Sequence, residues 1–246
     1  MIIGSNLIYF TGLTSSNTCA LSLAREKKVA EGTVVYTDFQ TEGKGQSGSS
    51  WESEKGKNLL ISVILFPLSV RPEDQFIISM AISVGICDFI DIYLPGSKIK
   101  WPNDIYVNDK KIAGILIENS IMGASFETAV AGIGLNINQE NYPPDIPNPV
   151  SLKMITGKEY DRGRCMQQLL ECLDSRYSQV LYGNRNKLWN EYVSRLFRIN
   201  EWHLYSSGKR TFRGMLTGIS SYGKALIMEM NGPCRQYDFR EVDFIR

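Results

Sequence analysis

Hydrophobic side chains recur at the spacing of an amphipathic helix in four parts of the chain. One of these segments starts at Pro72 with acidic residues next to it, as helices often do, and it must end before Pro95. Another carries an apolar stripe that Gly183 ends. The predicted helices cover residues 15–31, 72–94, 162–182 and 184–196.

Shorter apolar runs between these helices predict strands. The run at 58–66 is apolar at nearly every position, so we expect a buried strand there. Beyond about residue 200, short strands alternate with Gly and Asn-Gly turns. The other predicted strands lie at 34–40, 98–101, 104–108, 111–119 and 128–138. This order predicts an α+β domain at residues 1–198, followed by a small β-barrel of the SH3-like type at residues 199–246.

The chain has 27 Lys and Arg and 26 Asp and Glu, so its net charge is close to zero. This balance gives no electrostatic footprint for nucleic acid or for an anionic membrane, so neither is an expected partner. No apolar run approaches the roughly 20 residues of a membrane-spanning helix. The N-terminal stretch MIIGSNLIYF lacks the basic start and cleavage site of a secretory signal. We therefore expect a cytoplasmic protein.

The histidine and cysteine content narrows the chemistry. His203 is the only histidine, and it lies in the strand-like stretch EWHLY, so a multi-histidine metal enzyme is excluded and a Ser-His-Asp hydrolase would depend on this one residue. The five cysteines are scattered without a C-x-x-C pair, which favours reduced structural thiols over a zinc site. The site is expected to use lysine, carboxylates, amides and backbone donors.

A glycine-rich loop at 41–57 is the first candidate for ligand binding. Gly43, Gly45 and Gly48 form G-x-G-x-x-G, but no helix follows as a dinucleotide-binding turn requires. The protein-kinase motifs that would accompany such a loop are absent, and Ser49 stands where a Walker A loop needs lysine. What remains is a lysine-bearing loop whose backbone N–H groups suit an anion, with Trp51 as a flat apolar cover. The alternative is a surface loop that ends in a core tryptophan.

The stretch KWPNDIYVNDKKIAGILIEN is more informative, because Asn108-Asp109 suits a two-residue hairpin turn. The register that we assume pairs Val107 with Lys110, Tyr106 with Lys111, Ile105 with Ile112, and Asp104 with Ala113. Side chains alternate between faces, so Asp104 and Lys111 share one face, with Tyr106 and Ala113, as diagonal neighbours. This geometry selects Lys111 over Lys110 as the functional lysine. The alternative is a surface ion pair.

The stretch AGIGLNIN also divides into two faces. Ala131, Ile133, Leu135 and Ile137 form a core face, and Gly132, Gly134, Asn136 and Asn138 form the other. Two glycines weaken a central strand unless something approaches its backbone closely. A ligand could do so, with Asn136 beside a phosphate or a metal-bound water. A packed helix is the alternative.

Together these segments resemble the biotin protein ligases over nearly the whole chain, from about Gly12 to Arg246. The matching stretches are SSN at 15–17, TDFQTEGKGQSGSSW at 37–51, KWPND at 100–104, KIAGIL at 111–116, GIGLNIN at 132–138 and FRGMLTGISSYGKALI at 212–227. The resemblance implies a mixed β-sheet flanked by helices, of the class II synthetase-like kind, with the site on the sheet. The related lipoate or octanoate ligases and transferases are the alternative, but they lack KWPND. About 11 residues precede the ligase-like core, so we expect the type without an N-terminal DNA-binding domain.

The resemblance also implies an activity and its participants. Biotin is activated with ATP and Mg²⁺ to biotinyl-5′-AMP and then transferred to a lysine of a biotin carboxyl carrier domain. Lys111 is expected to contact the biotin carboxylate and the α-phosphate, and Asp104 to orient the acceptor amine or accept its proton. Implied biotin-binding residues are Ser15, Ser16, Asn17, Gln40, Gly43, Lys44, Trp51, Lys111 and Gly114. Implied nucleotide-binding residues are Lys44, Gly45, Gln46, Trp51, Asn103, Asp104, Lys111, Gly134 and Asn136, with Asn136 also near Mg²⁺.

The glycine-rich loop departs from the family pattern. That loop commonly reads G-R-G-R-x-x-R-x-W, whereas Lys44, Gln46 and Ser49 occupy the three arginine positions here. Arginine holds a phosphate with a planar fork of donors, and lysine offers only a point charge. We therefore expect weaker retention of the adenylate. Whether the chain is a monomer or a homodimer stays open.

Overall fold

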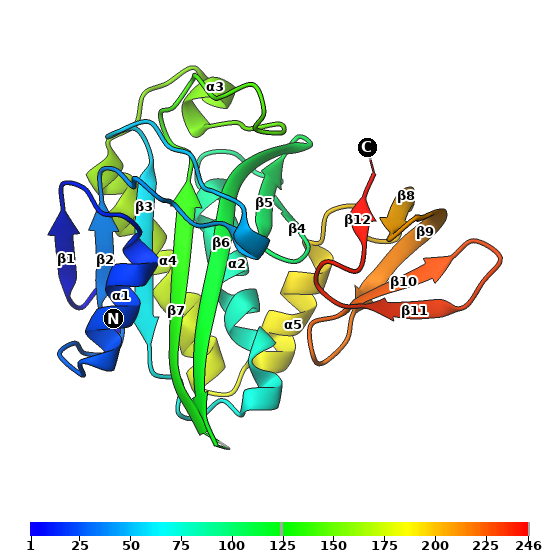
Figure 1. Ribbon diagram of the computed structural model, residues 1–246, viewed down its shortest axis with the longest axis horizontal. Coiled ribbons are helices and arrows are strands. Elements are labelled where there is room, and N and C mark those ends of the chain that lie inside the picture. Colours follow the sequence, from blue (N-terminus) through cyan, green and yellow to red (C-terminus); the bar gives the residue numbers. More distant parts are fainter. Residues whose placement is uncertain (124, 246) are drawn as a thin grey trace.

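The computed structural model describes residues 1–123 and 125–245, and its centre is a seven-stranded mixed sheet (Figure 1). The strand order is β1 (Leu7–Phe10), β2 (Val34–Thr37), β3 (Leu59–Leu65), β7 (Ser125–Leu135), β6 (Lys110–Met122), β5 (Asp104–Val107) and β4 (Lys98–Lys100). β1 and β2 are parallel, and the other neighbouring strands are antiparallel. The mixed sheet that we expected is therefore confirmed.

Helices cover the two faces of this sheet unequally. α1 (Ser16–Arg25) lies on the front face in Figure 1, whereas α2 (Phe76–Asp91), α4 (Arg162–Leu181) and α5 (Arg185–Ser194) lie behind it. The short α3 (Leu152–Thr156) lies at the top, and two 3₁₀ turns cover Gln46–Gly48 and Pro72–Asp74. Beside α1, the described ranges place no other α-helix on this face, which we call the open face.

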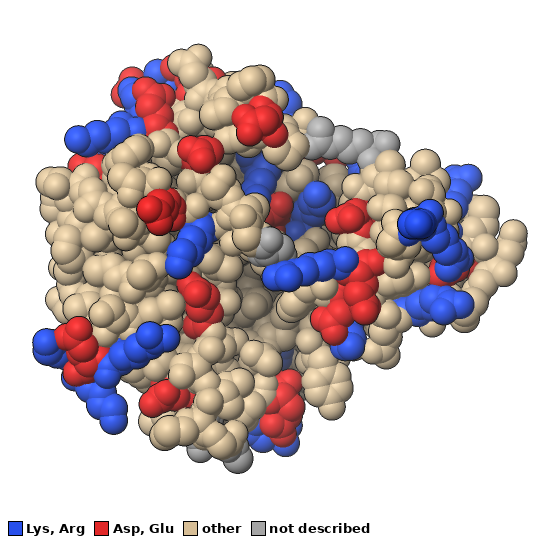
Figure 2. All heavy atoms as spheres, in the orientation of Figure 1, with Lys and Arg blue, Asp and Glu red and all other residues tan. Residues whose placement is uncertain are grey.

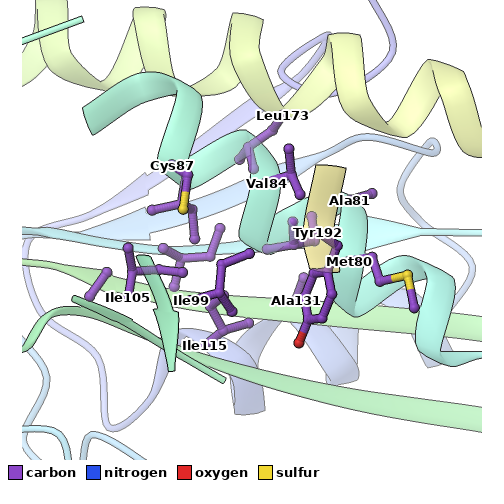
Figure 3. Packing of buried hydrophobic residues seen from close by; sticks show 14 of the residues in the cluster. Met80, Ala81, Val84, Cys87, Ile99, Ile105, Ile115, Ala131, Leu173 and Tyr192 are labelled. Carbon is purple, nitrogen blue, oxygen red and sulfur yellow. The ribbon is translucent and has the colours of Figure 1, made fainter. Parts of the chain in front are cut away.

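The main core lies between the sheet and the helices behind it (Figure 3). Every residue of β3 is buried, as its apolar run predicts. α2 is buried almost all round, because the sheet covers one side and α4 the other. A Cβ at Gly85 would lie 3.0 Å from Leu173 Cδ2, so this glycine lets the two helices approach closely. The result is a rigid support for the open face.

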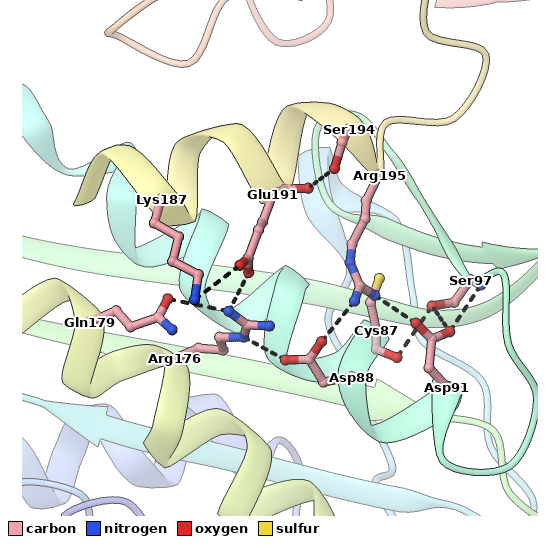
Figure 4. A network of polar contacts seen from close by, with 10 residues as sticks. All are labelled: Cys87, Asp88, Asp91, Ser97, Arg176, Gln179, Lys187, Glu191, Ser194 and Arg195. Carbon is pink, nitrogen blue, oxygen red and sulfur yellow. Dashed lines mark hydrogen bonds and ion pairs between the residues drawn. The ribbon is translucent and has the colours of Figure 1, made fainter. Parts of the chain in front are cut away.

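An ion network joins α2, α4 and α5 at the edge of this helical layer (Figure 4). Asp88 accepts hydrogen bonds from Arg176 Nε at 2.5 Å and from Arg195 Nη2 at 2.9 Å. Arg195 Nη1 also lies 2.9 Å from Asp91 Oδ2, and Arg176 pairs with Glu191. The five side chains are 14–29% exposed, so the charges are only partly screened.

We expect Asp88→Ala to lower the free energy of unfolding by about 2 kcal/mol, because it leaves two half-buried arginines short of a partner. Chemical denaturation measures this change. The control is Glu73→Ala, which removes an exposed partner of Arg71 and should change stability by less than about 0.5 kcal/mol. Equal effects of the two substitutions would show that the network does not stabilise the helical layer.

The C-terminal part forms a second, five-stranded antiparallel sheet. Its order is β11 (Cys234–Tyr237), β10 (Ala225–Glu229), β9 (Arg210–Ile219), β8 (Trp202–Ser207) and β12 (Asp243–Phe244). The expected SH3-like barrel thus has its strands, although no hydrogen-bonded ladder joins β11 to β12 in the described part of the chain. The two sheets are in contact, since Trp101 Nε1 donates to Gly223 O at 2.8 Å. The predicted domain boundary at residue 198 stays a prediction.

Several predicted boundaries are wrong. The helix expected at 15–31 ends at Arg25, and Lys27 has a left-handed φ of 53°. Glu26, Lys27 and Lys28 are charged and exposed, so no apolar side chain extends the buried face of the helix at these positions. The long helix opens with a 3₁₀ turn at Pro72 and becomes an α-helix only at Phe76. β1 and α3 were not predicted.

Two further observations concern the cysteines and the apolar character of the helices. All five cysteines are unpaired, and burial raises the pKa of the Cys87 thiol to about 11, as for an inert structural thiol. Among the described residues, no helix combines the length and apolar character needed to cross a membrane.

Candidate active site

The open face of the sheet holds two adjoining cavities. The inner cavity, of about 160 Å³, lies between α1 and strands β6 and β7. The outer cavity, of about 810 Å³, lies beyond it, towards the loop at 142–149. Figure 2 shows this face hollowed near its middle, with acidic and basic side chains around the hollow. The cavities share part of their lining, namely Ser49, Ser50, Trp51, Asp104 and Lys111.

The β5–β6 hairpin positions the two charged members of this shared lining. Asn108 and Asp109 both have positive φ, 47° and 60°, which confirms the two-residue turn. The observed pairs are Val107 with Lys110, Tyr106 with Lys111, Ile105 with Ala113, and Asp104 with Gly114.

The first two pairs confirm the predicted register, and the last two contradict it. A β-bulge between Ile105 and Tyr106 shifts the pairing by one residue. As a result, Ile112 and Ala113 are both fully buried in the core. Gly114, not Ala113, therefore joins Asp104 and Lys111 on the site face.

Lys111 and Asp104 touch directly. Lys111 Nζ lies 2.7 Å from Asp104 Oδ1, and the two side chains are 29% and 19% exposed. The Lys111 backbone is fixed by Asn148, whose carbonyl accepts its N–H, and by Val150, which donates to its carbonyl. Lys111 Nζ also lies 5.5 Å from the Trp51 ring, close enough for a cation–π contact. This places a positive charge where the cavities meet.

Trp51 lies flat against the sheet because two glycines leave room for it. A Cβ on Gly134 would lie 2.2 Å from Trp51 Cε2, and one on Gly114 would lie 2.8 Å from Trp51 Cζ3. The close approach predicted at the glycines of AGIGLNIN is therefore confirmed at Gly134. At Gly132 the neighbour is Asn17 of α1, whose Oδ1 would lie 2.2 Å from a Cβ. A packed helix was the alternative explanation, and it holds for this second glycine.

The start of α1 forms the polar end of the inner cavity. Ser16 N and Oγ lie 2.7 and 3.1 Å from Gln40 Oε1, which leaves the Gln40 amide nitrogen to donate elsewhere. Ser15 occupies the N-cap position, but its side chain makes no capping bond, so its hydroxyl remains available to the cavity that it lines. Asn17 donates to Leu116 O at 3.1 Å and is otherwise held by protein groups.

Ser62 and Glu118 are site-supporting residues that the sequence reasoning missed. Ser62 Oγ donates to Asn17 Oδ1 at 2.6 Å and lies 2.8 Å from Ser16 Oγ. Glu118 Oε2 accepts from Asn17 Nδ2 at 2.9 Å. The signal for Ser62 was one polar residue within the apolar run LLISVIL, since a fully buried hydroxyl needs a partner.

The glycine-rich loop crosses in front of the sheet in a folded conformation. Lys44 and Ser50 form a β-bridge, and Trp51 N donates to Gly43 O at 2.8 Å. Gly43 is needed here, since a Cβ would lie 2.3 Å from Trp51 O. The loop brings its other predicted residues, Lys44, Gly45 and Gln46, to the wall of the inner cavity. The loop is thus ordered and ends in a tryptophan that packs on the sheet, and its role in binding stays a prediction.

Two residues that line the outer cavity each have a buried polar atom without a partner. Trp51 Nε1 and Asn136 Oδ1 are buried, and neither has a hydrogen-bond partner among the described residues. Asn136 Nδ2 is held by Val150 O at 3.1 Å, which leaves the oxygen free to accept. The opposite wall comes from the loop at 142–149, with Tyr142, Ile146 and three prolines. That proline-rich wall was also missed, although its composition indicates a rigid segment.

Of the remaining predicted residues, one lines the inner cavity and two lie outside both cavities. Asn103 lines the inner cavity and donates to Ile115 O at 2.8 Å, so it also braces β6. Asn138 exchanges hydrogen bonds with the Tyr160 backbone and lines neither cavity. His203 lies on β8, 3.0 Å from Glu201, and also lines neither cavity. Within the described ranges, no group of three or more His, Cys, Asp or Glu could hold a metal ion.

Residues 8–136, which include Lys111, Asp104 and the other residues expected to bind biotin or the nucleotide, match the model of the biotin/lipoate A/B protein ligase family. The chain belongs to this family. A relative named bifunctional ligase/repressor BirA, from Bacillus subtilis, is 32% identical over 241 residues, which cover 94% of this chain and 71% of the relative. The biotin–[acetyl-CoA-carboxylase] ligase of Mycobacterium tuberculosis is 29% identical over 169 residues, covering 67% of this chain and 61% of the relative.

A solved member of the same family has this fold throughout. The biotin protein ligase from Aquifex aeolicus in complex with biotin and ATP superposes with a TM-score of 0.82 at 27% identity. The match covers 98% of this chain and 99% of that structure, so both sheets are included.

Proposed function

We infer that this chain is a biotin protein ligase, which activates biotin with ATP and transfers it to a lysine of a carrier protein. The observation that carries this function is the wall shared by the two cavities, where Lys111 and Asp104 meet under Trp51. A reaction that joins an acid to a nucleotide needs two binding spaces that meet at one charged point. The names of the relatives and of the solved structure support the same function.

In the first step, biotin occupies the inner cavity and ATP the outer one. Ser15, Ser16 and the amide nitrogen of Gln40 bind the polar head of biotin, while Asn17 holds them in place. The biotin carboxylate points at Lys111. An oxygen of that carboxylate attacks the α-phosphorus, the bond to the bridging oxygen breaks, and pyrophosphate leaves with the electron pair. Lys111 offsets the repulsion between the two anions and stabilises charge at phosphorus.

The loop that carries Lys44, Gly45 and Gln46 covers the acyl-adenylate. Trp51 closes the space between the cavities, because it lies directly on the two glycines of the sheet. Its Nε1 and the Oδ1 of Asn136 are buried without partners among the described residues, so a nucleotide that reaches them would satisfy both atoms. Covering the mixed anhydride excludes water, which would otherwise hydrolyse it.

The residues present suit a magnesium ion that arrives with ATP. Magnesium keeps several waters and binds through one or two protein groups plus phosphate oxygens. The buried, unpartnered Oδ1 of Asn136 is such an oxygen donor, and its cavity has no protein cage that would replace the phosphates. Asn136 would hold the ion, directly or through water, and the ion would neutralise charge on the phosphates.

In the second step, the amine of the carrier lysine attacks the acyl carbon of biotinyl-AMP. An amide bond forms, the bond between the acyl carbon and the phosphate oxygen breaks, and AMP leaves. Asp104 orients the amine and accepts its proton. Asp104 suits this role because it lies 2.7 Å from Lys111, the residue assigned to the biotin carboxylate, and lines both cavities.

Lipoate or octanoate transfer is the second candidate, because the family model covers those enzymes too. The polar end of the inner cavity favours biotin, since the hydroxyls of Ser15 and Ser16 and the amide of Gln40 suit a head that hydrogen-bonds. A plain acyl chain would leave the Ser15 hydroxyl and the Gln40 amide nitrogen without a ligand partner, whereas the Ser16 hydroxyl is already bonded to Gln40 and Ser62.

The decisive experiment is transfer to a biotin carboxyl carrier domain with ATP and Mg²⁺, using biotin and lipoate in parallel. We expect labelling of the carrier lysine with biotin, accompanied by AMP and pyrophosphate release, and none with lipoate. Labelling with lipoate alone would replace the proposal with its alternative. Biotin binding without pyrophosphate release would indicate a binding module that lacks the reaction.

Retention of the adenylate gives a further prediction. Gln46 and Ser49 occupy positions where the family loop has arginine, and Ser49 Oγ is engaged with Gln46 O at 2.7 Å. We expect Gln46→Arg to slow release of biotinyl-AMP by about tenfold, since a charged fork in place of the neutral amide is worth about 1.4 kcal/mol. Rapid dilution of the preformed complex measures the rate. Gln46→Lys is the control for charge without the fork, and an unchanged rate in Gln46→Arg would rule out missing charge as the cause.

Three expectations stay predictions. They are the biotin carboxyl carrier domain as the partner, the cytoplasmic location, and a monomeric or homodimeric state.

A further inference from the structure

Arg240 has a strained backbone next to the candidate site. It lies in the turn between β11 and β12, and its φ of +74° falls in the left-handed region that favours glycine. Its side chain is exposed and makes no hydrogen bond or ion pair with any residue that the structure describes. Neither packing nor pairing therefore explains why an arginine stands here, and strained positions of this kind often serve binding.

The turn is nevertheless fixed to the large sheet. The ring of the preceding residue, Phe239, lies 5.4 Å from that of Trp101 and 6.1 Å from that of Phe76. Trp101 also donates to Gly223 O, so two points of the C-terminal part are held beside the KWPND segment. Arg240 is thus an exposed side chain on a turn that Phe239 holds by its ring contacts.

A groove of about 370 Å³ connects this turn with the candidate active site. Its lining includes Gln46 of the glycine-rich loop, Lys100, Asp104 and Phe244, together with Arg240. Lys100 and Asp104 also line the outer cavity, so the groove continues directly from the nucleotide space. Two carboxylates also line the groove, namely Asp104, which is paired with Lys111, and Asp243.

We propose that Arg240 binds the β- and γ-phosphates of ATP and the pyrophosphate that they become. The proposal rests on the ligase function stated above. The glycine-rich loop brings only Lys44 to the cavities as a cation, because Gln46 and Ser49 are uncharged and its other lysines, Lys55 and Lys57, line neither cavity. As the α-phosphorus bond breaks, its electron pair passes to pyrophosphate, and charge there grows. A guanidinium can receive that charge through two parallel hydrogen bonds. Arg240 thus supplies from the C-terminal sheet a charged fork that the loop lacks.

The test replaces Arg240 with glycine, because glycine adopts a positive φ without backbone strain. We expect Arg240→Gly to keep or raise the thermal stability of the full chain. Biotin-dependent ATP–pyrophosphate exchange should show KM values for ATP and pyrophosphate raised by about tenfold, equivalent to about 1.4 kcal/mol. Arg240→Lys should give KM values between those of the wild type and those of Arg240→Gly. Biotin binding should not change.

The matched control is Asn231→Gly, which removes a left-handed side chain (φ 63°) at the exposed β10–β11 turn. It relieves similar strain without removing charge, so its KM for ATP should equal that of the wild type. A second measurement gives Arg240→Gly the preformed adenylate and a carrier domain, and we expect an unchanged transfer rate.

Two outcomes would overturn the proposal. Unchanged KM values for ATP and pyrophosphate would show that Arg240 does not contact the phosphates. Slower transfer from the preformed adenylate, with those KM values unchanged, would assign Arg240 to the carrier. If the wild type itself shows no biotin-dependent exchange, the proposed ligase function fails first, and this result is distinct from both.

Discussion

Lys111→Ala should lower the rate of biotinyl-adenylate formation by about a hundredfold or more, because one charge-assisted contact at phosphorus is lost. Lys111 Nζ is the cationic group placed where both cavities meet, 2.7 Å from Asp104. The fold should remain intact, since a partly exposed ion pair contributes little to stability. Biotin-dependent pyrophosphate exchange measures the rate, and circular dichroism with thermal unfolding measures the fold.

The neighbouring lysine provides the control. Lys110 precedes Lys111 in β6, but it is exposed and lines neither cavity. Lys110→Ala should therefore retain nearly full exchange activity. Equal losses in the two variants would mean that the side of the hairpin on which a lysine lies does not determine its role.

Local patterns in the sequence predicted much of the site. The turn at Asn108-Asp109 set the pairs nearest to it, so Lys111 was correctly placed beside Asp104. Alternation also separated Ile133 from Gly134, because a strand gives each neighbour the opposite face. These predictions needed only residues that are close in the chain.

The incorrect predictions concern features that depend on tertiary contacts and not on the local sequence. No local pattern predicts the bulge at Ile105–Tyr106. It buries both Ile112 and Ala113 and leaves Gly114, which has no side chain, under Trp51. The β-bridge between Lys44 and Ser50 likewise gives the glycine-rich loop an order that its composition did not suggest.

Long-range contacts were the least predictable part. Ser62 approaches Asn17 from a strand 45 residues away along the chain. Gly223 meets Trp101 across 122 residues, and this contact anchors the C-terminal sheet beside the site. The sequence predicted that second sheet, but it contained no signal that Arg240 would share a groove with Asp104.

The second large effect is expected at Gly134, where one methyl group should disturb the site without unfolding the chain. The added Cβ would lie 2.2 Å from Trp51 Cε2 and 2.6 Å from its Nε1, so the indole must move. Trp51 separates the two cavities and contacts Lys111. A displacement of about 1 Å in such a site can cost a hundredfold in rate, and we expect that loss in adenylate formation for Gly134→Ala.

The double variant isolates the cause. If the clash with the indole is responsible, Gly134→Ala combined with Trp51→Ala should be no slower than Trp51→Ala alone, since the methyl group then has nothing to displace. Gly12→Ala is the matched control, because a Cβ there meets nothing within 4 Å. It should keep wild-type exchange. A double variant much slower than Trp51→Ala would show that the methyl group obstructs the ligand directly. The glycine would then keep the strand open for the substrate itself, and the tryptophan would be only its neighbour.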